Sequence, residues 1–256
     1  MSHLMNNYGR LPVSFDHGQG VWLWDKEGHK YLDALAGIAV NSVGHAHPRL
    51  VRAIADQASK LIHCSNYFNI DLQEKVAEKL VEHSGLEAVF FCNSGLEANE
   101  CAIKIARKFG HTKGIEVPNI IVLKHAFHGR SIATLSATGN PSVREDFSPY
   151  TEGFIFVDES DLNGIRKIVE ENKNVVAIFF EPILGEGGVV PIDLSVIKGI
   201  REICDEHDLL MMCDEVQCGM GRSGKWFAHQ WAEIKPDVIT MAKGLAGGVP
   251  VGAVIV

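Results

Sequence analysis

The chain has 256 residues, of which 24 are basic and 32 acidic, and its formal net charge is −8. This composition is typical of a globular protein that buries a large core, and the net negative charge argues against a nucleic-acid partner. No apolar run approaches the ~20 residues of a membrane-spanning helix, so no membrane partner is expected. The six cysteines form no CxxC pair, which predicts reduced thiols in a cytoplasmic protein.

The first part of the chain has the pattern of a small α+β segment. Its predicted elements are a hairpin-like set of strands and two helices, at 13–15, 21–24, 31–32, 48–62 and 71–83. Gly18, Gly20 and Gly28 are expected at the turns of the hairpin. We therefore expect residues 1–75 to form an N-terminal segment that contributes to a small domain.

Residues 76–256 have a different pattern, in which short apolar runs alternate with amphipathic stretches. The runs interpreted as strands are 88–92, 119–124, 154–158, 175–181, 209–214, 237–241 and 251–256. Ser94 and Glu97 form a capping-box pattern that starts a helix running to about Phe109, and another helix is predicted over Ser195–Glu206. The alternation predicts an α/β domain with a mostly parallel seven-stranded sheet and helices on both faces. Because the chain stops inside the last run, we expect a truncated chain that lacks a C-terminal small domain.

Three segments with candidate chemistry follow predicted strands. Asn93–Glu100 opens a helix, and its free N–H groups with Gly95 suit a phosphate, although a well-capped helix explains the pattern equally well. Asp214 ends a central strand, where a buried carboxylate needs a metal, an arginine or a protonated ring nitrogen as its partner. Lys243 follows the next strand, and apolar surroundings there favour a neutral, nucleophilic amine over the usual solvated lysine.

The other titratable residues are interpreted as structural or, for the histidines, as residues that support those in contact with a ligand. No His or Cys cluster has the spacing of metal ligands, so no metal is predicted. The residues in question are His45, His47, His125 and His128, together with Glu181-Pro182 at a strand end.

Taken together, the candidate segments resemble the fold-type I pyridoxal-phosphate enzymes and, within them, the class III aminotransferases, over nearly the whole chain. The motifs that carry the resemblance are Gly37-Ile-Ala-Val-Asn41, Gly44-His-Ala-His-Pro48, Asn93-Ser-Gly-Leu-Glu-Ala-Asn-Glu100, His125-Ala-Phe-His-Gly-Arg130, Glu181-Pro-Ile-Leu-Gly-Glu-Gly-Gly188, Asp214-Glu-Val-Gln-Cys-Gly-Met-Gly-Arg222 and Ala242-Lys-Gly244. The resemblance implies pyridoxal 5′-phosphate as cofactor and a small-molecule amino donor with 2-oxoglutarate as substrates. It also implies a homodimer with its active site at the subunit interface.

The resemblance implies roles for individual residues. Lys243 forms the Schiff base and then moves a proton, Asp214 keeps the ring nitrogen protonated, and Arg130 grips the substrate α-carboxylate. The remaining cofactor-binding residues are Ser94, Gly95 and Leu96 at the phosphate, Phe127 and Val216 on the ring faces, and Gln217 near the ring hydroxyl. Leu96 stands where the family usually has a smaller residue, a change that leaves backbone N–H donation intact.

Three further residues bear on substrate choice. Glu186 resembles the residue that masks an arginine, which we expect beyond residue 256. Tyr8 matches a tyrosine of enzymes that act on ornithine, whereas Ile38, within Gly37–Val40, favours the branch that converts N2-acetyl-L-ornithine to N-acetyl-L-glutamate 5-semialdehyde in arginine biosynthesis. The alternatives are aminotransferases for ornithine, succinylornithine, succinyldiaminopimelate or 4-aminobutyrate, and an inactive relative that only binds the cofactor. A P-loop nucleotide binder is disfavoured because GxxxxGK[ST] is absent.

Overall fold

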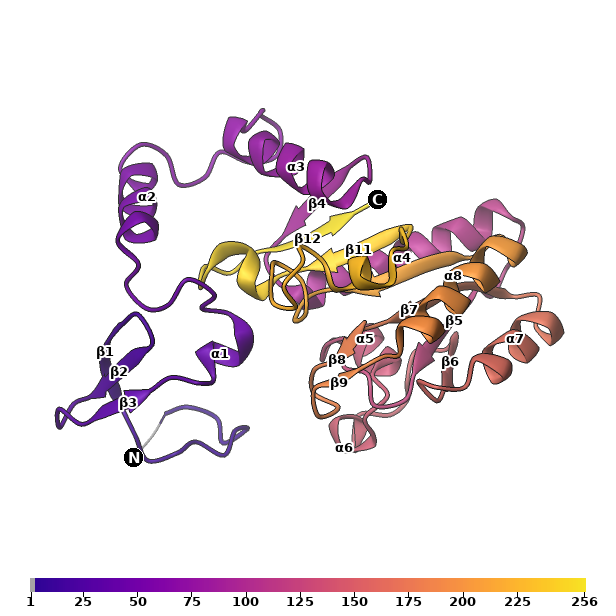
Figure 1. Cartoon of the computed structure of the whole chain (residues 1–256), viewed down its shortest axis with the longest axis horizontal. Coiled ribbons are helices and arrows are strands. Elements are labelled where there is room, and N and C mark those ends of the chain that lie inside the picture. The colour runs from indigo at the N-terminus through magenta and orange to yellow at the C-terminus, as the bar shows by residue number, and fades with distance from the viewer. Residues whose placement is uncertain (1–2) are drawn as a thin grey trace. The chain divides into compact units, whose positions relative to one another are not determined.

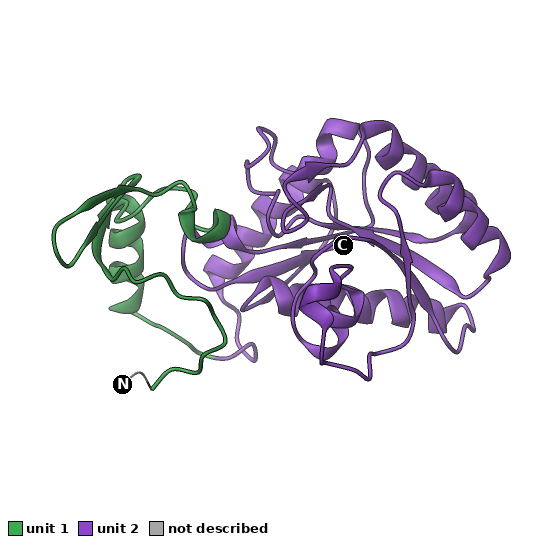
Figure 2. Cartoon of the chain, turned by 90° about the horizontal axis from the view of Figure 1, so that it is seen from below, with its two compact units in different colours: residues 1–64 green, residues 65–256 purple. Residues whose placement is uncertain are grey.

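A computed structural model describes residues 3–256, which fall into two units, one up to residue 64 and one from residue 65 (Figures 1 and 2). The first unit contains an antiparallel sheet of β1 (Phe15–Gln19), β2 (Trp22–Asp25) and β3 (Lys30–Leu32), followed by α1 (Ala36–Ala39) and α2 (Pro48–Ala58). The predicted hairpin strands and the first predicted helix are confirmed, with different ends. The assignment of residues 1–75 to a small domain stays a prediction.

Two details of the first unit correct the sequence-based expectations. Gly18 lies inside β1 and not in a turn, and a Cβ atom there would stand 2.7 Å from the Cβ of His45, so the glycine allows close packing. Gly20 and Gly28 do occupy turns, with φ of 59° and 87°. Helix α2 ends at Ala58, and the hydroxyl of the next residue, Ser59, donates to the Asp56 carbonyl at 2.8 Å.

The second unit is built on a seven-stranded sheet in the order β4-β12-β11-β10-β7-β5-β6. Its strands are β4 (Val89–Cys92), β5 (Asn119–Leu123), β6 (Phe154–Val157), β7 (Val175–Phe180), β10 (Leu210–Asp214), β11 (Val238–Met241) and β12 (Gly252–Ile255). A short ribbon is formed by β8 (Ile183–Leu184) and β9 (Val190–Pro191). β12 runs antiparallel to β11 and β4, and the other pairs are parallel, so the predicted strands and the mostly parallel sheet are confirmed.

Helices cover both faces of this sheet (Figure 1). They are α3 (Asp71–Ser84), α4 (Gly95–Thr112), α5 (Ile132–Ala137), α6 (Pro141–Arg144), α7 (Leu162–Glu171) and α8 (Leu194–His207), with the 3-10 helices η1 (Ala228–Ala232) and η2 (Lys243–Ala246). Side chains alternate along β5, so that Ile120 belongs to a core cluster with α4 and Ile121 to a second cluster with α7 and α8. Both faces of the central strands are therefore buried, which explains their continuously apolar sequences.

The direction of the strands positions the candidate residues. β4, β5, β7, β10 and β11 run in the same direction, so their carboxyl ends lie along one edge of the sheet. This is the edge where open α/β sheets bind ligands. The segments that leave it begin at Asn93, Lys124, Glu181, Glu215 and Ala242.

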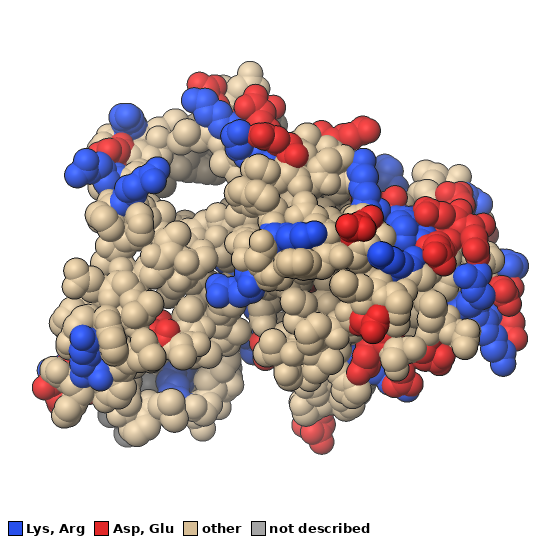
Figure 3. Space-filling model, in the orientation of Figure 1, with Lys and Arg blue, Asp and Glu red and all other residues tan. Residues whose placement is uncertain are grey.

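The surface near α7 and α8 carries charges of both signs. On the face shown in Figure 3, Lys and Arg side chains are interspersed with Asp and Glu at this end of the second unit. Ion pairs join Lys113 to Asp208 at 2.9 Å and Arg201 to Asp205 at 2.8 Å. The Lys113–Asp208 pair, in which Asp208 is exposed, contributes little to stability. Every helix within residues 3–256 is too short or too polar to cross a membrane.

Candidate active site

Asp214 is the last residue of β10 and is only 3% exposed. Its Oδ2 atom accepts hydrogen bonds from Asn99 Nδ2 at 2.7 Å and from His128 Nδ1 at 2.8 Å. Its Oδ1 atom accepts the backbone N–H of Val216 at 3.0 Å. These three donors hold the carboxylate in one orientation, which suits a cationic partner.

Two residues of this network were not predicted as partners of Asp214. Asn99 lies on the buried face of α4, and its Nδ2 also donates to the His128 carbonyl at 2.7 Å. The His128 ring stacks on Phe179 with a centroid distance of 4.1 Å, and its buried Nε2 has no hydrogen-bond partner among the described residues. Because the carboxylate oxygen of Asp214 is the acceptor, His128 donates to it through Nδ1. The sequence-based interpretation of His128, as a structural residue or as one that supports a ligand-contacting residue, agrees with this contact but did not identify Asp214 as its partner.

The start of α4 lies against the segments that follow β10 and β11. A Cβ atom on Gly95 would stand 2.7 Å from Val216 Cγ1 and 3.4 Å from Ala242 Cβ, so only glycine fits. Similarly, a Cβ atom on Gly252 would stand 2.2 Å from the Ser94 carbonyl oxygen. The sequence-predicted Ser94, Gly95 and Val216 are thus brought together.

The helix cap differs from the predicted capping box. Ser94 Oγ accepts the Glu97 N–H at 3.2 Å as expected, but the Glu97 carboxylate accepts the backbone N–H of Asn93, at 2.6 Å, and not that of Ser94. The N–H groups of Gly95 and Leu96 lie in the first turn, where a helix offers no internal acceptor. The positive end of the α4 helix dipole therefore lies at the sheet edge, and these free N–H groups can donate to a phosphate there.

Lys243 begins η2 directly after the buried residue Ala242. Its φ of 44° lies in the left-handed region, which costs a residue with a side chain ~1 kcal/mol. Burial lowers the pKa of Lys243, while the negative charges of Asp214 and Glu186 oppose that shift. A half-buried amine beside carboxylates, held in a strained conformation, is suited to exchange protons.

Glu181 follows β7 directly and is 5% exposed. Burial and, secondly, the nearby Asp214 raise the pKa of Glu181 to about 7. Its Oε2 atom accepts the backbone N–H of Phe127 at 2.9 Å, and its Oε1 atom accepts that of Gly185 at 3.2 Å. Interpreting Glu181 as a structural strand end therefore left out its proximity to Asp214.

The remaining predicted residues occupy defined places. Phe127 is half-buried in the loop after β5, Arg130 is exposed in the same loop, and Glu186 is exposed in the turn after β8. Gln217 is half-buried after β10 and packs so tightly on Gly185 that a Cβ atom there would stand 2.3 Å from Gln217 Oε1. Tyr8 and Ile38 belong to the first unit, where both are exposed.

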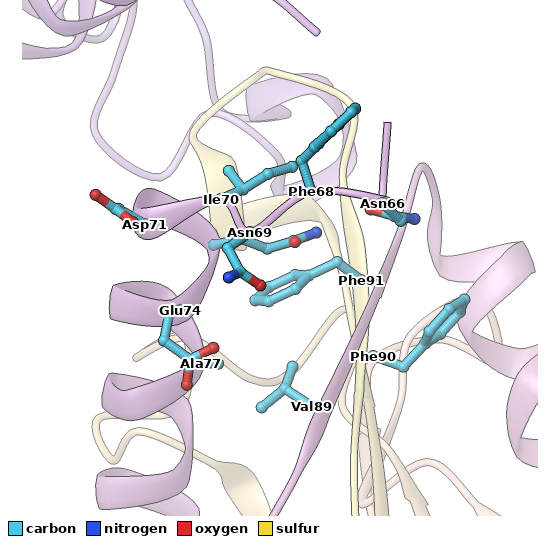
Figure 4. Close-up of a pocket in the computed structure, with 11 residues that line it drawn as sticks. Asn66, Phe68, Asn69, Ile70, Asp71, Glu74, Ala77, Val89, Phe90 and Phe91 are labelled. Carbon is cyan, nitrogen blue, oxygen red and sulfur yellow. The ribbon is translucent and has the colours of Figure 1, made fainter. Parts of the chain in front are cut away.

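A cavity of about 550 Å³ lies away from these residues, between the start of α3 and the edge strand β4 (Figure 4). Val89 and Phe91 point toward α3, whereas Phe90 points to the other side of the strand, as the alternation along a strand requires. None of the sequence-predicted site residues lines it. The chemistry of the residues therefore places the candidate active site at the carboxyl edge of the sheet.

The residues at that edge fit pyridoxal 5′-phosphate. The glycine cradle at Gly95 leaves backbone N–H groups open to a phosphate, and the Asp214 carboxylate is fixed for a protonated nitrogen. Lys243 supplies the amine. Within residues 3–256, no group of three or more His, Cys, Asp or Glu side chains is arranged to hold a metal ion.

The class-III aminotransferase family model matches residues 4–256. The chain belongs to the class-III aminotransferases. Its relatives include proteins named acetylornithine aminotransferase from Nitrosomonas europaea, 54% identical over 99% of this chain and 64% of that protein, and from Synechocystis sp., 50% identical over 99% of this chain and 61% of that protein. The chain thus spans less than two thirds of the length of these relatives.

Solved structures give the same family. Ornithine aminotransferase from Toxoplasma gondii superposes with a TM-score of 0.94 at 34% identity, over 99% of this chain and 61% of that one. N-acetylornithine aminotransferase from Stenotrophomonas maltophilia superposes with a TM-score of 0.84 at 40% identity, over 97% of this chain and 63% of that one. A second Toxoplasma gondii structure holds PLP at partial occupancy in its active site. The predicted fold, family and cofactor are confirmed.

Proposed function

We propose that this chain binds the cofactor of an aminotransferase that transfers the amino group of N2-acetyl-L-ornithine to 2-oxoglutarate. The products are N-acetyl-L-glutamate 5-semialdehyde and L-glutamate, in arginine biosynthesis. The observation that carries the proposal is the pair of neighbouring strand ends, because β10 ends at the triply hydrogen-bonded Asp214 and β11 leads to the half-buried Lys243. The names of curated relatives that are 50% to 54% identical support the acetylated substrate.

Pyridoxal 5′-phosphate, when bound, supplies a ring that accepts the electron pair left on the substrate carbon after loss of a proton. Lys243 removes and returns that proton, because burial lowers its pKa and increases the share of neutral amine. The Asp214 carboxylate holds the ring nitrogen in its protonated form through charge attraction. Both tasks need fixed groups, and Asn99 and His128 fix Asp214.

The other proposed contacts orient cofactor and substrate. Ser94, Gly95 and Leu96 bind the phosphate through the start of α4, and Phe127 and Val216 cover the ring on its two sides. Gln217 donates near the ring hydroxyl. Arg130 binds the substrate α-carboxylate as a two-pronged donor.

Substrate choice is assigned to Glu186, Tyr8 and Ile38. The rivals are ornithine, succinylornithine, succinyldiaminopimelate and 4-aminobutyrate, and the high TM-score with an ornithine aminotransferase makes ornithine the main one. The test is a comparison of kcat/KM for these donors with 2-oxoglutarate, using a protein that contains this chain in full. N2-acetyl-L-ornithine is expected to give the highest value. A higher value for free ornithine would overturn the substrate assignment and leave the reaction type intact.

A protein that binds the cofactor without turning over any donor is the non-enzymatic alternative. It would show the absorbance of the bound cofactor but no change on addition of amino donors. The intact Lys243, Asp214 and Arg130 support the enzyme. Lys243→Ala is the matched control for this assay, because it removes the amine and leaves the phosphate cradle.

We also propose a cytoplasmic homodimer with its active site at the subunit interface. All six cysteines are free thiols, which a reducing compartment favours. Sedimentation measurements over a range of concentrations test the dimer. A monomer that retains full turnover would contradict it.

A further inference from the structure

Glu181 joins two segments of the candidate active site through one carboxyl group. Its Oε2 atom accepts the N–H of Phe127, in the loop between β5 and α5, at 2.9 Å. Its Oε1 atom accepts the N–H of Gly185, in the turn that carries Glu186, at 3.2 Å. Phe127 and Gly185 lie 54 and 4 residues from Glu181, so this one side chain ties a distant loop to a local turn.

The same two segments also pack against each other and against the segment after β10. A Cβ atom on Gly187 would stand 3.0 Å from the His125 carbonyl oxygen, so the turn lies directly against the loop. A Cβ atom on Gly185 would stand 2.3 Å from Gln217 Oε1, so the turn also lies against the segment after Asp214. Glu181 is thus buried beneath a three-way junction of segments that carry proposed cofactor and substrate contacts.

We propose that Glu181 is a positioning residue, whose carboxyl group locks the loop of Phe127 and Arg130 to the turn of Glu186 and so fixes the amino-donor site. The effect of Glu181 on the amino-donor site rests on the proposed function. The lock itself follows from the two hydrogen bonds and the close packing of glycines. Because the two N–H donors each occupy a different oxygen, a group with a single acceptor oxygen cannot hold both.

The charges around Glu181 make the lock dependent on pH. The groups that act on it are Asp214 at the end of β10 and His128 in the Phe127 loop, and it acts in turn on Lys243 and on the Cys218 thiol. Burial and the nearby Asp214 raise the pKa of Glu181 to about 7, while the two N–H donors and His128 oppose this rise. Above that pH the ionised carboxylate accepts both N–H groups strongly, and below it one oxygen carries a proton and accepts more weakly.

The first test measures backbone hydrogen exchange at Phe127 and Gly185 in the holoenzyme. In Glu181→Gln one of these amides loses its acceptor, and its exchange is expected to be ~10-fold faster. Glu171→Gln, on the exposed side of α7, is the matched control and should leave both amides unchanged. This measurement does not depend on turnover, so its result stands whether or not the proposed function is correct. Unchanged exchange at both amides in Glu181→Gln would overturn the proposal.

The second test separates KM from kcat. Glu181→Gln is expected to raise KM for the amino donor ~10-fold with a smaller change in kcat, because the loop of Arg130 loses its anchor. The variation of the donor KM with pH near neutrality should disappear in this variant. Glu181→Asp keeps two acceptor oxygens on a shorter side chain, so its donor KM should lie between those of the parent and Glu181→Gln. This variant also provides the test if Glu181→Gln folds poorly. A donor KM that is unchanged in both variants, or a pH dependence retained in Glu181→Gln, would overturn the proposal.

Discussion

Asp214 and Glu215 are consecutive buried carboxylates that differ in the number and origin of their hydrogen-bond donors. Asp214 receives three hydrogen bonds, from Asn99, His128 and the backbone of Val216. Glu215 receives four, from the backbone N–H groups of Ala228 and His229, from His229 Nδ1 and from the Cys218 thiol. A carboxylate offers about four acceptor positions, so Glu215 is saturated and Asp214 keeps one for a ligand.

The two carboxylates differ in which elements supply their hydrogen-bond donors. Asp214 is held by donors from α4 and the loop after β5, at the edge where the strand ends converge. Glu215 accepts the backbone N–H groups of Ala228 and His229 in η1, so its side chain links the two ends of the segment 215–229. The two residues have similar burial, 3% and 1% exposed, so burial does not distinguish a reactive carboxylate from a structural one. The two kinds of carboxylate are distinguished by the number of hydrogen-bond donors and by the elements that supply them.

The largest effect is expected at Lys243, which acts together with Asp214 in the proposed reaction. Lys243→Ala removes the amine that carries the proton, and kcat is expected to fall by ~10⁴-fold. Steady-state kinetics with the best amino donor measure this, and Lys235→Ala, an exposed lysine, is the control. A Lys243→Ala variant that retains a tenth of the parent turnover would refute the assignment.

Asp214→Asn tests the carboxylate itself. The amide keeps the shape of the side chain but has no charge to offer a protonated ring nitrogen, so kcat is expected to fall by ~10³-fold. Absorbance of the bound cofactor reports whether binding persists. An unchanged kcat would remove Asp214 from this role.

Glu215→Gln is the structural counterpart. An amide cannot accept four donors, so the free energy of unfolding is expected to fall by ~3 kcal/mol while kcat of the folded fraction changes little. Denaturant unfolding and kinetics on the same preparation separate the two effects. A large loss of kcat at unchanged stability would show that Glu215 belongs to the active site and would end the contrast with Asp214.

The strands, the main helices and Asp214 could be predicted because their signals are local. Continuous apolar runs mark β7 and β10, and the Ser94 cap marks the start of α4. The partners of Asp214 could not be predicted in this way, because Asn99 and His128 lie 115 and 86 residues away in the chain. Only the strand order, which places β10 between β7 and β11, brings them together.

A weaker signal for Asn99 was nevertheless present. Asn99 lies on the buried stripe of α4 between Ala98 and Ala102, where a polar side chain needs a buried partner. The proximity of Glu181 to Asp214 had no such signal, because a carboxylate at a strand end is also compatible with exposure to solvent. Its burial depends on how the 125–130 loop folds over it.

The charge of Glu181 gives a pH test of the same edge. The pKa of Glu181 rises from 4.5 to about 7 on folding, so between these values the folded protein keeps a proton that the unfolded chain has released. Stability from this group therefore falls as pH rises through that window, by up to ~3 kcal/mol, and levels off above it. Unfolding free energies of the parent minus those of Glu181→Gln should show this decline. A difference that stays flat or increases with pH would contradict it.

The smallest expected effect concerns His128, which acts on the reaction only through Asp214. His128→Leu and His128→Asn both lose the ring that stacks on Phe179, but only the leucine loses the N–H donor to Asp214 Oδ2. Loss of one charge-assisted hydrogen bond is expected to lower kcat ~10-fold in His128→Leu, whereas the asparagine amide nitrogen replaces Nδ1 and recovers most of it. Equal losses of kcat in the two variants would mean that His128 contributes by packing alone. Asp214 would then be held by Asn99 and the Val216 backbone, and its difference from the saturated Glu215 would be larger still.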